Sequence, residues 1–180
     1  ASDCGISVDT ARRWISVLDR TGRRAYDVNI YGIDARFWRF HGRANPAGQD
    51  ESAAVVGAGL AGSLDFREGD DLLLRIETRR DVPRETLFGR REDAGRTIRL
   101  AGAKILPANQ LGEFALQPNQ ATIRALFVPL RRLQQVLDEP DRANAVLLTP
   151  TAAAGVEQVR AAMQATFTLD DVGVRLRPLP

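Results

Sequence analysis

Three glycines in the stretch VVGAGLAGSLDFREGDDLLLRIE (residues 55–77) have the types and the spacing of a dinucleotide-binding turn. Gly57, Gly59 and Gly62 form a G-x-G-x-x-G pattern after two valines, and Glu77 lies twenty residues beyond the first glycine. In such a site the glycines let a strand-to-helix turn approach a pyrophosphate closely, and the acidic residue binds a ribose hydroxyl. This pattern is typical of a dinucleotide-dependent oxidoreductase.

The chain after the third glycine is too short for that site. Only residues 63–71 precede the strand-like segment that starts at Leu72, and the sequence REGDD (67–71) among them is typical of a turn. A connection that returns the chain to a parallel strand needs a dozen or more residues. We therefore predict a short helix over 59–64, a tight turn and then a strand, with no bound cofactor. The oxidoreductase stays as an alternative, which requires Glu77 to end a neighbouring parallel strand.

The other reactive side chains do not assemble into a catalytic set. His41 is the only histidine and lies among aromatic residues, where packed or surface histidines are more frequent than catalytic ones. The pairs Asp70–Asp71 and Asp170–Asp171 consist of adjacent residues, which point to opposite faces of a strand or are solvated in a turn. The single cysteine, Cys4, excludes an internal disulfide bond and a cysteine-based metal cluster. We predict no catalytic, cofactor-binding or metal-binding residues.

The charged residues argue against a nucleic-acid-binding surface. The chain carries one lysine, Lys104, among 25 basic residues, and its formal net charge is only +2. Arginine pairs such as Arg12–Arg13 and Arg79–Arg80 are dispersed, with acidic residues between them. This distribution is typical of solvated faces and not of a phosphate-binding groove. No apolar run approaches the roughly 18–20 residues that cross a bilayer.

The segment GISVDTARRWISVL (5–18) predicts an amphipathic helix. Ser7 is a candidate N-cap, and apolar residues recur at helical spacing up to Leu18. An alternative interpretation is the second half of a helix-turn-helix, in which Arg12 and Arg13 face phosphates. A DNA-binding regulator of this kind would also require a further helix beside this one.

The remaining segments predict an α+β fold with a mixed sheet and an irregular β-rich lobe. From residue 124 the pattern is a βαβαβ run, which indicates a sheet with helices on one face. Outside that run we predict strands over 25–33, 72–78 and 97–106, the last bent near Gly102, and a helical turn over 34–42. Within it we predict strands over 125–129, 144–148 and 172–179, and helices over 130–138 and 153–167.

Five segments, taken together, resemble the extracytoplasmic domain of ABC transporter permeases of the MacB/FtsX type. They are VNIYGIDARFWRFHG (28–42), FREGDDLLLRIE (66–77), LQPNQATIRALFVPLRRLQQVL (116–137), RANAVLL (142–148) and LDDVGVRLRPL (169–179). They follow the order in which the family has them and cover most of residues 26–180. The resemblance extends to the turn that precedes Leu72, which Gly69 and Asp70 preserve.

The resemblance weakens toward the N-terminus. Residues 1–19 resemble the helix-turn-helix segment of certain bacterial AAA-type ATPases that carry an appended domain of unknown function. We therefore divide the chain into an N-terminal segment, 1–24, and a permease-like domain, 25–180, in which 67–123 is a β-rich lobe. Within that lobe, the charged segment 79–96 is a candidate for a mobile or partner-facing region, and the alternative is an ordinary exposed loop.

The family resemblance implies a domain that lies between transmembrane helices and protrudes on the periplasmic side of the cell membrane. It implies no bond chemistry and no cofactor for this domain. Such a domain transmits conformational change while a cognate ABC ATPase hydrolyses ATP on the cytoplasmic side. The implied partners are that ATPase, a periplasmic adaptor or transported substrate, and a second copy of the full-length permease in a homodimer; nucleic acid is not among them.

Overall fold

The computed structural model describes residues 4–9, 15–19, 22–48, 50, 53–77, 95–101, 103–117, 120–149 and 155–168. These residues form helices and strands in an α+β fold, as predicted. The chain divides into two compact units. Residues 2–147 contain both sheets, whereas residues 148–180, which belong to the second unit, contain helix α4 (Val156–Thr166).

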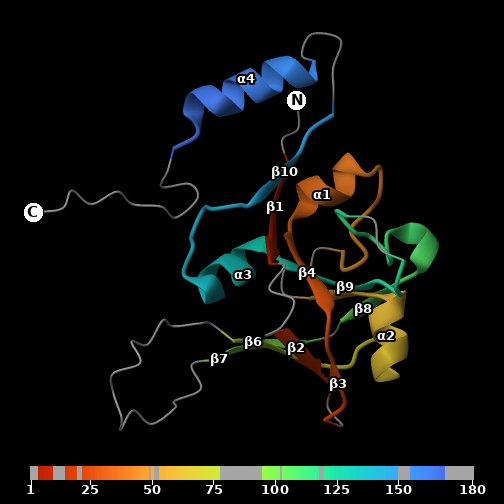
Figure 1. Ribbon diagram of the computed structural model, residues 1–180. Helices are drawn as coiled ribbons and strands as arrows, with labels where there is room; N and C mark the ends of the chain where they lie inside the picture. The colour runs from red at the N-terminus through yellow and green to blue at the C-terminus, as the bar shows by residue number, and fades with distance from the viewer. Residues whose placement is uncertain are drawn as a thin grey trace, which may run out of the picture. The chain divides into compact units, whose positions relative to one another are not determined.

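The larger sheet has six strands in mixed orientation, and Figure 1 shows their arrangement. Their order is β10 (Ala145–Leu147), β1 (Cys4–Asp9), β4 (Val28–Ile33), β9 (Arg124–Pro129), β5 (Val55–Gly57) and β8 (Lys104–Leu106). The pairs β4–β9 and β5–β8 are parallel, and the other three pairs are antiparallel. The central β4–β9 pair runs from Val28 opposite Arg124 to Ile33 opposite Pro129.

The smaller sheet is antiparallel throughout. Its order is β3 (Arg24–Ala25), β2 (Ile15–Leu18), β6 (Leu72–Glu77) and β7 (Gly95–Leu100). In β6 and β7 the alternating residues Leu72, Leu74, Ile76, Ile98 and Leu100 are buried. One face of this sheet therefore packs into a core, because successive strand residues point to opposite faces.

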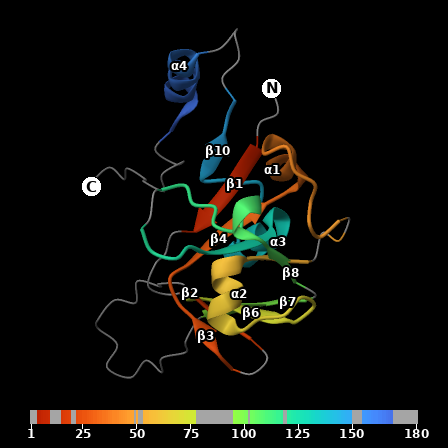
Figure 2. The same cartoon turned by 90° about the vertical axis from the view of Figure 1, so that its right-hand side faces the viewer.

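Two hydrophobic clusters cover the two faces of the larger sheet. Val28 and Ile30 of β4 belong to the cluster that also contains the smaller sheet, α2 (Ala58–Leu64) and α3 (Leu130–Leu137). Tyr31 and Ile33 of the same strand belong to the other cluster, with residues of α1 (Ala35–Phe40). Figures 1 and 2 show α1 beside β1. The helices of this unit therefore cover both faces, and the prediction of helices on one face is wrong in this respect.

The predicted helix over residues 5–18 is also wrong. Residues 4–9 form β1, which pairs with β10 and β4, and residues 15–18 form β2, which pairs with β3 and β6. Residues 10–14 lie outside the described residues. The helical spacing of the apolar residues coincides with a segment rich in β-branched residues, and pairing with distant strands decides between the two structures. The DNA-binding alternative loses the helix on which it depended.

The predicted strand over 97–106 is divided between the sheets. Its first part is β7, in the smaller sheet, and its last part is β8, in the larger one. The predicted bend at Gly102 lies outside the described residues, as does the strand over 172–179. The helical turn over 34–42, the strand over 72–78 and the elements from 125 to 167 are confirmed, although each boundary shifts by a few residues.

Candidate functional site

A crevice lies where the two central parallel strands of the larger sheet end. β4 ends at Ile33 and leads into α1, whereas the adjacent β9 ends at Pro129 and leads into α3. Since α1 and α3 pack in different clusters, the chain leaves the two strand ends toward opposite faces of the sheet. In open α/β sheets ligands bind in crevices of this kind, outside the carboxyl ends of strands whose connections diverge. The volume of the crevice is about 1600 Å³.

The start of α1 is organised by Asp34. The Asp34 carboxylate accepts a hydrogen bond of 2.8 Å from the backbone N–H of Arg36, which makes Asp34 the N-cap of the helix. The Arg36 guanidinium also donates to this carboxylate, over 2.9 Å from Nε and 2.7 Å from Nη2. Burial acts to raise the pKa of Asp34, but the hydrogen bonds and charge of Arg36 outweigh it, so the pKa is lowered. Asp34 and Arg36, which both line the crevice, therefore neutralise each other.

The helix on the other side, α3, is bonded to both sheets. Its Leu133 is fully buried in the cluster between the two sheets. The guanidinium of Arg132 donates a hydrogen bond of 2.7 Å to the backbone carbonyl of Arg99 in β7. In return, Arg96 of β7 donates to the carbonyl of Val136 at the other end of α3. Two arginine hydrogen bonds thus join α3 to the smaller sheet. The first residue of α3 directly follows β9 of the larger sheet.

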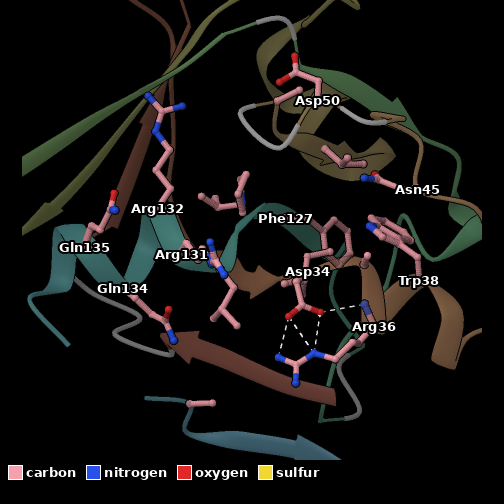
Figure 3. A pocket seen from close by; sticks show the side chains of 18 of the residues that line it. Asp34, Arg36, Trp38, Asn45, Asp50, Phe127, Arg131, Arg132, Gln134 and Gln135 are labelled. Atoms are coloured by element: carbon pink, nitrogen blue, oxygen red, sulfur yellow. Dashed lines mark hydrogen bonds and ion pairs between the residues drawn. The ribbon is translucent and has the colours of Figure 1, made fainter. Parts of the chain in front are cut away.

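The lining of the crevice is part apolar and part polar, as Figure 3 shows. Trp38 and Phe127 contribute an aromatic wall, and their ring centroids are 5.7 Å apart. Asn45 and Asp50 come from the chain between α1 and β5, and Gln135 comes from α3. A lining that combines apolar side chains with a few polar groups is typical of small-molecule sites.

The glycine pattern from which the dinucleotide hypothesis came lies elsewhere and serves packing. Gly57 ends β5 and Gly59 lies in the first turn of α2. A Cβ atom at Gly57 would come within 2.2 Å of the Gly112 carbonyl oxygen, and one at Gly59 within 2.3 Å of the Ile123 carbonyl oxygen. The third glycine, Gly62, has open space around it. The first two glycines therefore admit the close approach of the backbone at Gly112 and Ile123.

The strand topology does not meet the other requirement of the dinucleotide hypothesis. In a dinucleotide site the strand after the helix lies beside the first strand and parallel to it. Here the strand after α2 is β6, which belongs to the smaller sheet, whereas β5 pairs with β8 and β9. Glu77 ends β6 and therefore lies at the end of a strand in the smaller sheet, whereas the hypothesis requires a strand beside β5 in the larger one.

His41 lies in an aromatic cluster at the end of α1. Its ring centroid lies 4.7 Å from that of Phe37 and 5.5 Å from that of Phe114, with both pairs edge to face. Burial lowers the pKa of His41, and its buried Nε2 atom has no hydrogen-bond partner among the described residues. His41 is not among the residues that line the crevice. These contacts agree with the prediction of a packed histidine.

The remaining residues that the sequence singled out have structural contacts or lie outside the described residues. The Asp70 carboxylate accepts from the backbone N–H of Arg67 within the predicted turn, and Asp71 pairs with Arg99 at 2.6 Å. Arg12, Arg13, Asp170 and Asp171 lie outside the described residues, as do residues 79–94 of the candidate partner-facing segment.

Further observations limit what the described part of the chain can do. No group of three or more histidine, cysteine, aspartate or glutamate side chains in it could hold a metal ion. None of its helices has both the length and the apolar character that crossing a membrane requires. No protein-family model and no curated protein matches the chain.

Sequence reasoning missed the crevice because the crevice depends on the pairing of two distant strands. The only local signal was Asp34, which precedes a short aromatic segment and has the type of an N-cap. The sequence does not reveal that β4 and β9, about a hundred residues apart, lie side by side in parallel. Nor does it reveal that α1 and α3 pack on different faces.

Proposed function

We propose that this chain is a non-catalytic extracytoplasmic domain of an ABC transporter permease of the MacB/FtsX type. In this role it transmits conformational change, and contacts the substrate or a periplasmic adaptor, during ATP-driven export. The proposal starts from the resemblance of residues 26–180 to that family. The cognate ABC ATPase acts through other parts of the transporter, and a second copy of the full-length permease completes a homodimer.

The observation that carries the proposal is the position of α3. This helix lies within one of the resembling segments, 116–137, and two arginine hydrogen bonds and the buried Leu133 join it to the smaller sheet. Its first residue follows β9 of the larger sheet without a linker. A displacement at the crevice would therefore move both sheets together, because α3 continues from β9 of the larger sheet and is hydrogen-bonded to β7 of the smaller sheet.

The other resembling segments support the same interpretation. Segment 28–42 forms β4 and α1, and segment 66–77 forms the turn and β6. These elements share their two hydrophobic clusters with β9 and α3. Closely packed clusters resist deformation, so this unit is suited to move as a rigid body and to pass on a displacement.

Thiol labelling in cells tests the location. The host strain would express the chain from its own gene with Cys4→Ser and Arg67→Cys, because Arg67 is exposed and lies in a turn away from the crevice. A membrane-impermeant maleimide should label intact cells as strongly as permeabilised cells. Labelling that appears only after permeabilisation would overturn the proposal. The Cys4→Ser variant alone provides the background.

The genomic locus tests the transporter context. Transmembrane segments encoded on both sides of these residues, together with a neighbouring ABC ATPase gene, are the expected result. A locus with neither would refute the assignment to a permease even if the chain proved to be extracytoplasmic.

A further inference from the structure

The arginines of the crevice differ in what they bind. Four arginines line it: Arg36, Arg131, Arg132 and Arg142. Arg36 is held by Asp34, Arg132 donates to the Arg99 carbonyl, and Arg142 pairs with Glu139 at 3.3 Å. Among the described residues, Arg131 is the only lining arginine without a hydrogen bond or ion pair. Its side chain is exposed, and in Figure 3 it lies in the middle of the residues that line the crevice.

The acidic residues of the lining do not cancel this charge. The Asp34 carboxylate is occupied by Arg36. Asp50 comes from the chain before β5, and no ion pair joins it to Arg131 among the described residues. Asp141 follows the C-terminal end of α3, whereas Arg131 lies in the first turn of that helix. Asp141 makes no ion pair with Arg131 in the described part of the chain.

The lining of the crevice also contains exposed apolar side chains. Trp38 and Phe127 line it but are almost fully buried, whereas Val146 is half exposed and Pro129 is partly exposed. A bound molecule that places an acidic group on Arg131 can therefore lay an apolar body against Val146 and Pro129. The volume of about 1600 Å³ exceeds the roughly 300–1,000 Å³ of ordinary ligand pockets. The crevice therefore has room for an organic molecule with its bound water.

We propose that the crevice at the ends of β4 and β9 binds an organic anion, with the acidic group on Arg131 and the apolar part on Val146 and Pro129. A guanidinium binds carboxylate and phosphate groups in a planar, two-pronged geometry, so either acidic group fits. The inference does not depend on the membrane location, since it concerns only contacts within residues 2–147.

Two-dimensional NMR of the whole chain tests this proposal with sodium benzoate as the probe. Sodium acetate, which has the same acidic group without the aromatic body, and sodium phosphate are the comparisons, and sodium chloride keeps the ionic strength constant. Benzoate is expected to shift the Val146 and Arg131 amide signals in a saturable way, at concentrations lower than acetate requires. No saturable shift with any of the three anions would overturn the proposal.

Matched variants decide whether Arg131 provides the binding. Arg131→Gln removes the charge in the crevice, and Arg67→Gln removes the same charge from an exposed turn outside it. Loss of a hydrogen bond to a charged group should weaken benzoate binding by about tenfold or more in Arg131→Gln and leave it unchanged in Arg67→Gln. Equal binding by the two variants would refute the site. Spectra without ligand show whether each variant keeps the fold.

Discussion

Replacing Gly59 by alanine tests one of the closest packing contacts in the structure. The new Cβ atom would lie 2.3 Å from the Ile123 carbonyl oxygen and 2.9 Å from Cγ2 of Thr122, whereas real Cβ contacts are essentially never shorter than 3.0 Å. The backbone at Ile123 would have to retreat by about 0.7 Å to restore a 3.0 Å contact, and a backbone carbonyl yields less readily than the end of a side chain. We expect destabilisation, although alanine is the better helix former.

The neighbouring Gly62 provides the matched control. It lies in the same helix and is exposed, and a Cβ atom added to it would meet no other atom within 4 Å. Gly62→Ala should therefore show only the helix-propensity gain, about 0.5–1 kcal/mol. Because Gly59→Ala has the same gain, the difference between the two variants isolates the clash. Overpacking of this kind costs about 1–3 kcal/mol.

Urea unfolding at 25 °C, followed by circular dichroism and tryptophan fluorescence, measures that difference. With a slope of about 2 kcal/mol per molar urea, the two midpoints should differ by about 0.5–1.5 M, with Gly59→Ala the lower. Midpoints that shift equally and in the same direction would show that the backbone at Ile123 does not lie on α2. The packing explanation for the glycine pattern would then be wrong.

Three further experiments test the core, the cap and the histidine. Leu133→Ala should lower the free energy of unfolding by about 2–5 kcal/mol in urea titrations, because Leu133 is fully buried between the sheets; a loss below about 1 kcal/mol would contradict that burial. Asp34→Ala should cost about 0.5–2 kcal/mol through loss of the N-cap, while Asp34→Asn keeps the cap oxygen. Since the pKa of Asp34 is lowered in the folded chain, its contribution to stability should be present above about pH 3.8 and be lost below it. Both variants should lack this pH dependence of the free energy of unfolding. His41 has a folded pKa below 6.5, so the unfolded chain binds its proton first and stability should fall as the pH drops below about 6.5; NMR titration of this sole histidine gives the pKa, and a value above 6.5 would refute the burial argument.

Local patterns predicted the elements whose structure is decided locally. The segment before α1 carries its own N-cap, and the apolar residues of α3 recur at the spacing that buries Leu130 and Leu133. Strand β6 alternates between buried Leu72 and Leu74 and exposed Leu73, as a half-buried strand does. In these places propensity, capping and burial favour the same structure.

The prediction failed where distant pairing decides the structure. Segment 5–18 has the apolar spacing of a helix, but β1 and β2 are stabilised by hydrogen bonds to strands that include β10 and β6, far along the chain. The segment that forms β7 and β8 alternates like one strand, yet its halves join different sheets. The candidate site shares this dependence, because Arg131 and Trp38 line the same crevice only after β4 and β9 have paired.

The pairing of β1 with β10 delays the completion of this unit during synthesis. Cys4 lies opposite Leu147, so the register of this edge cannot form until the ribosome has made almost the whole unit. At about 5–20 residues per second, the roughly 140 residues between them take about 7–30 s to synthesise. During this interval one edge of β1 lacks its partner, and an unpaired edge invites association with other chains. A nascent chain of this protein is therefore expected to need a chaperone more than the finished protein does.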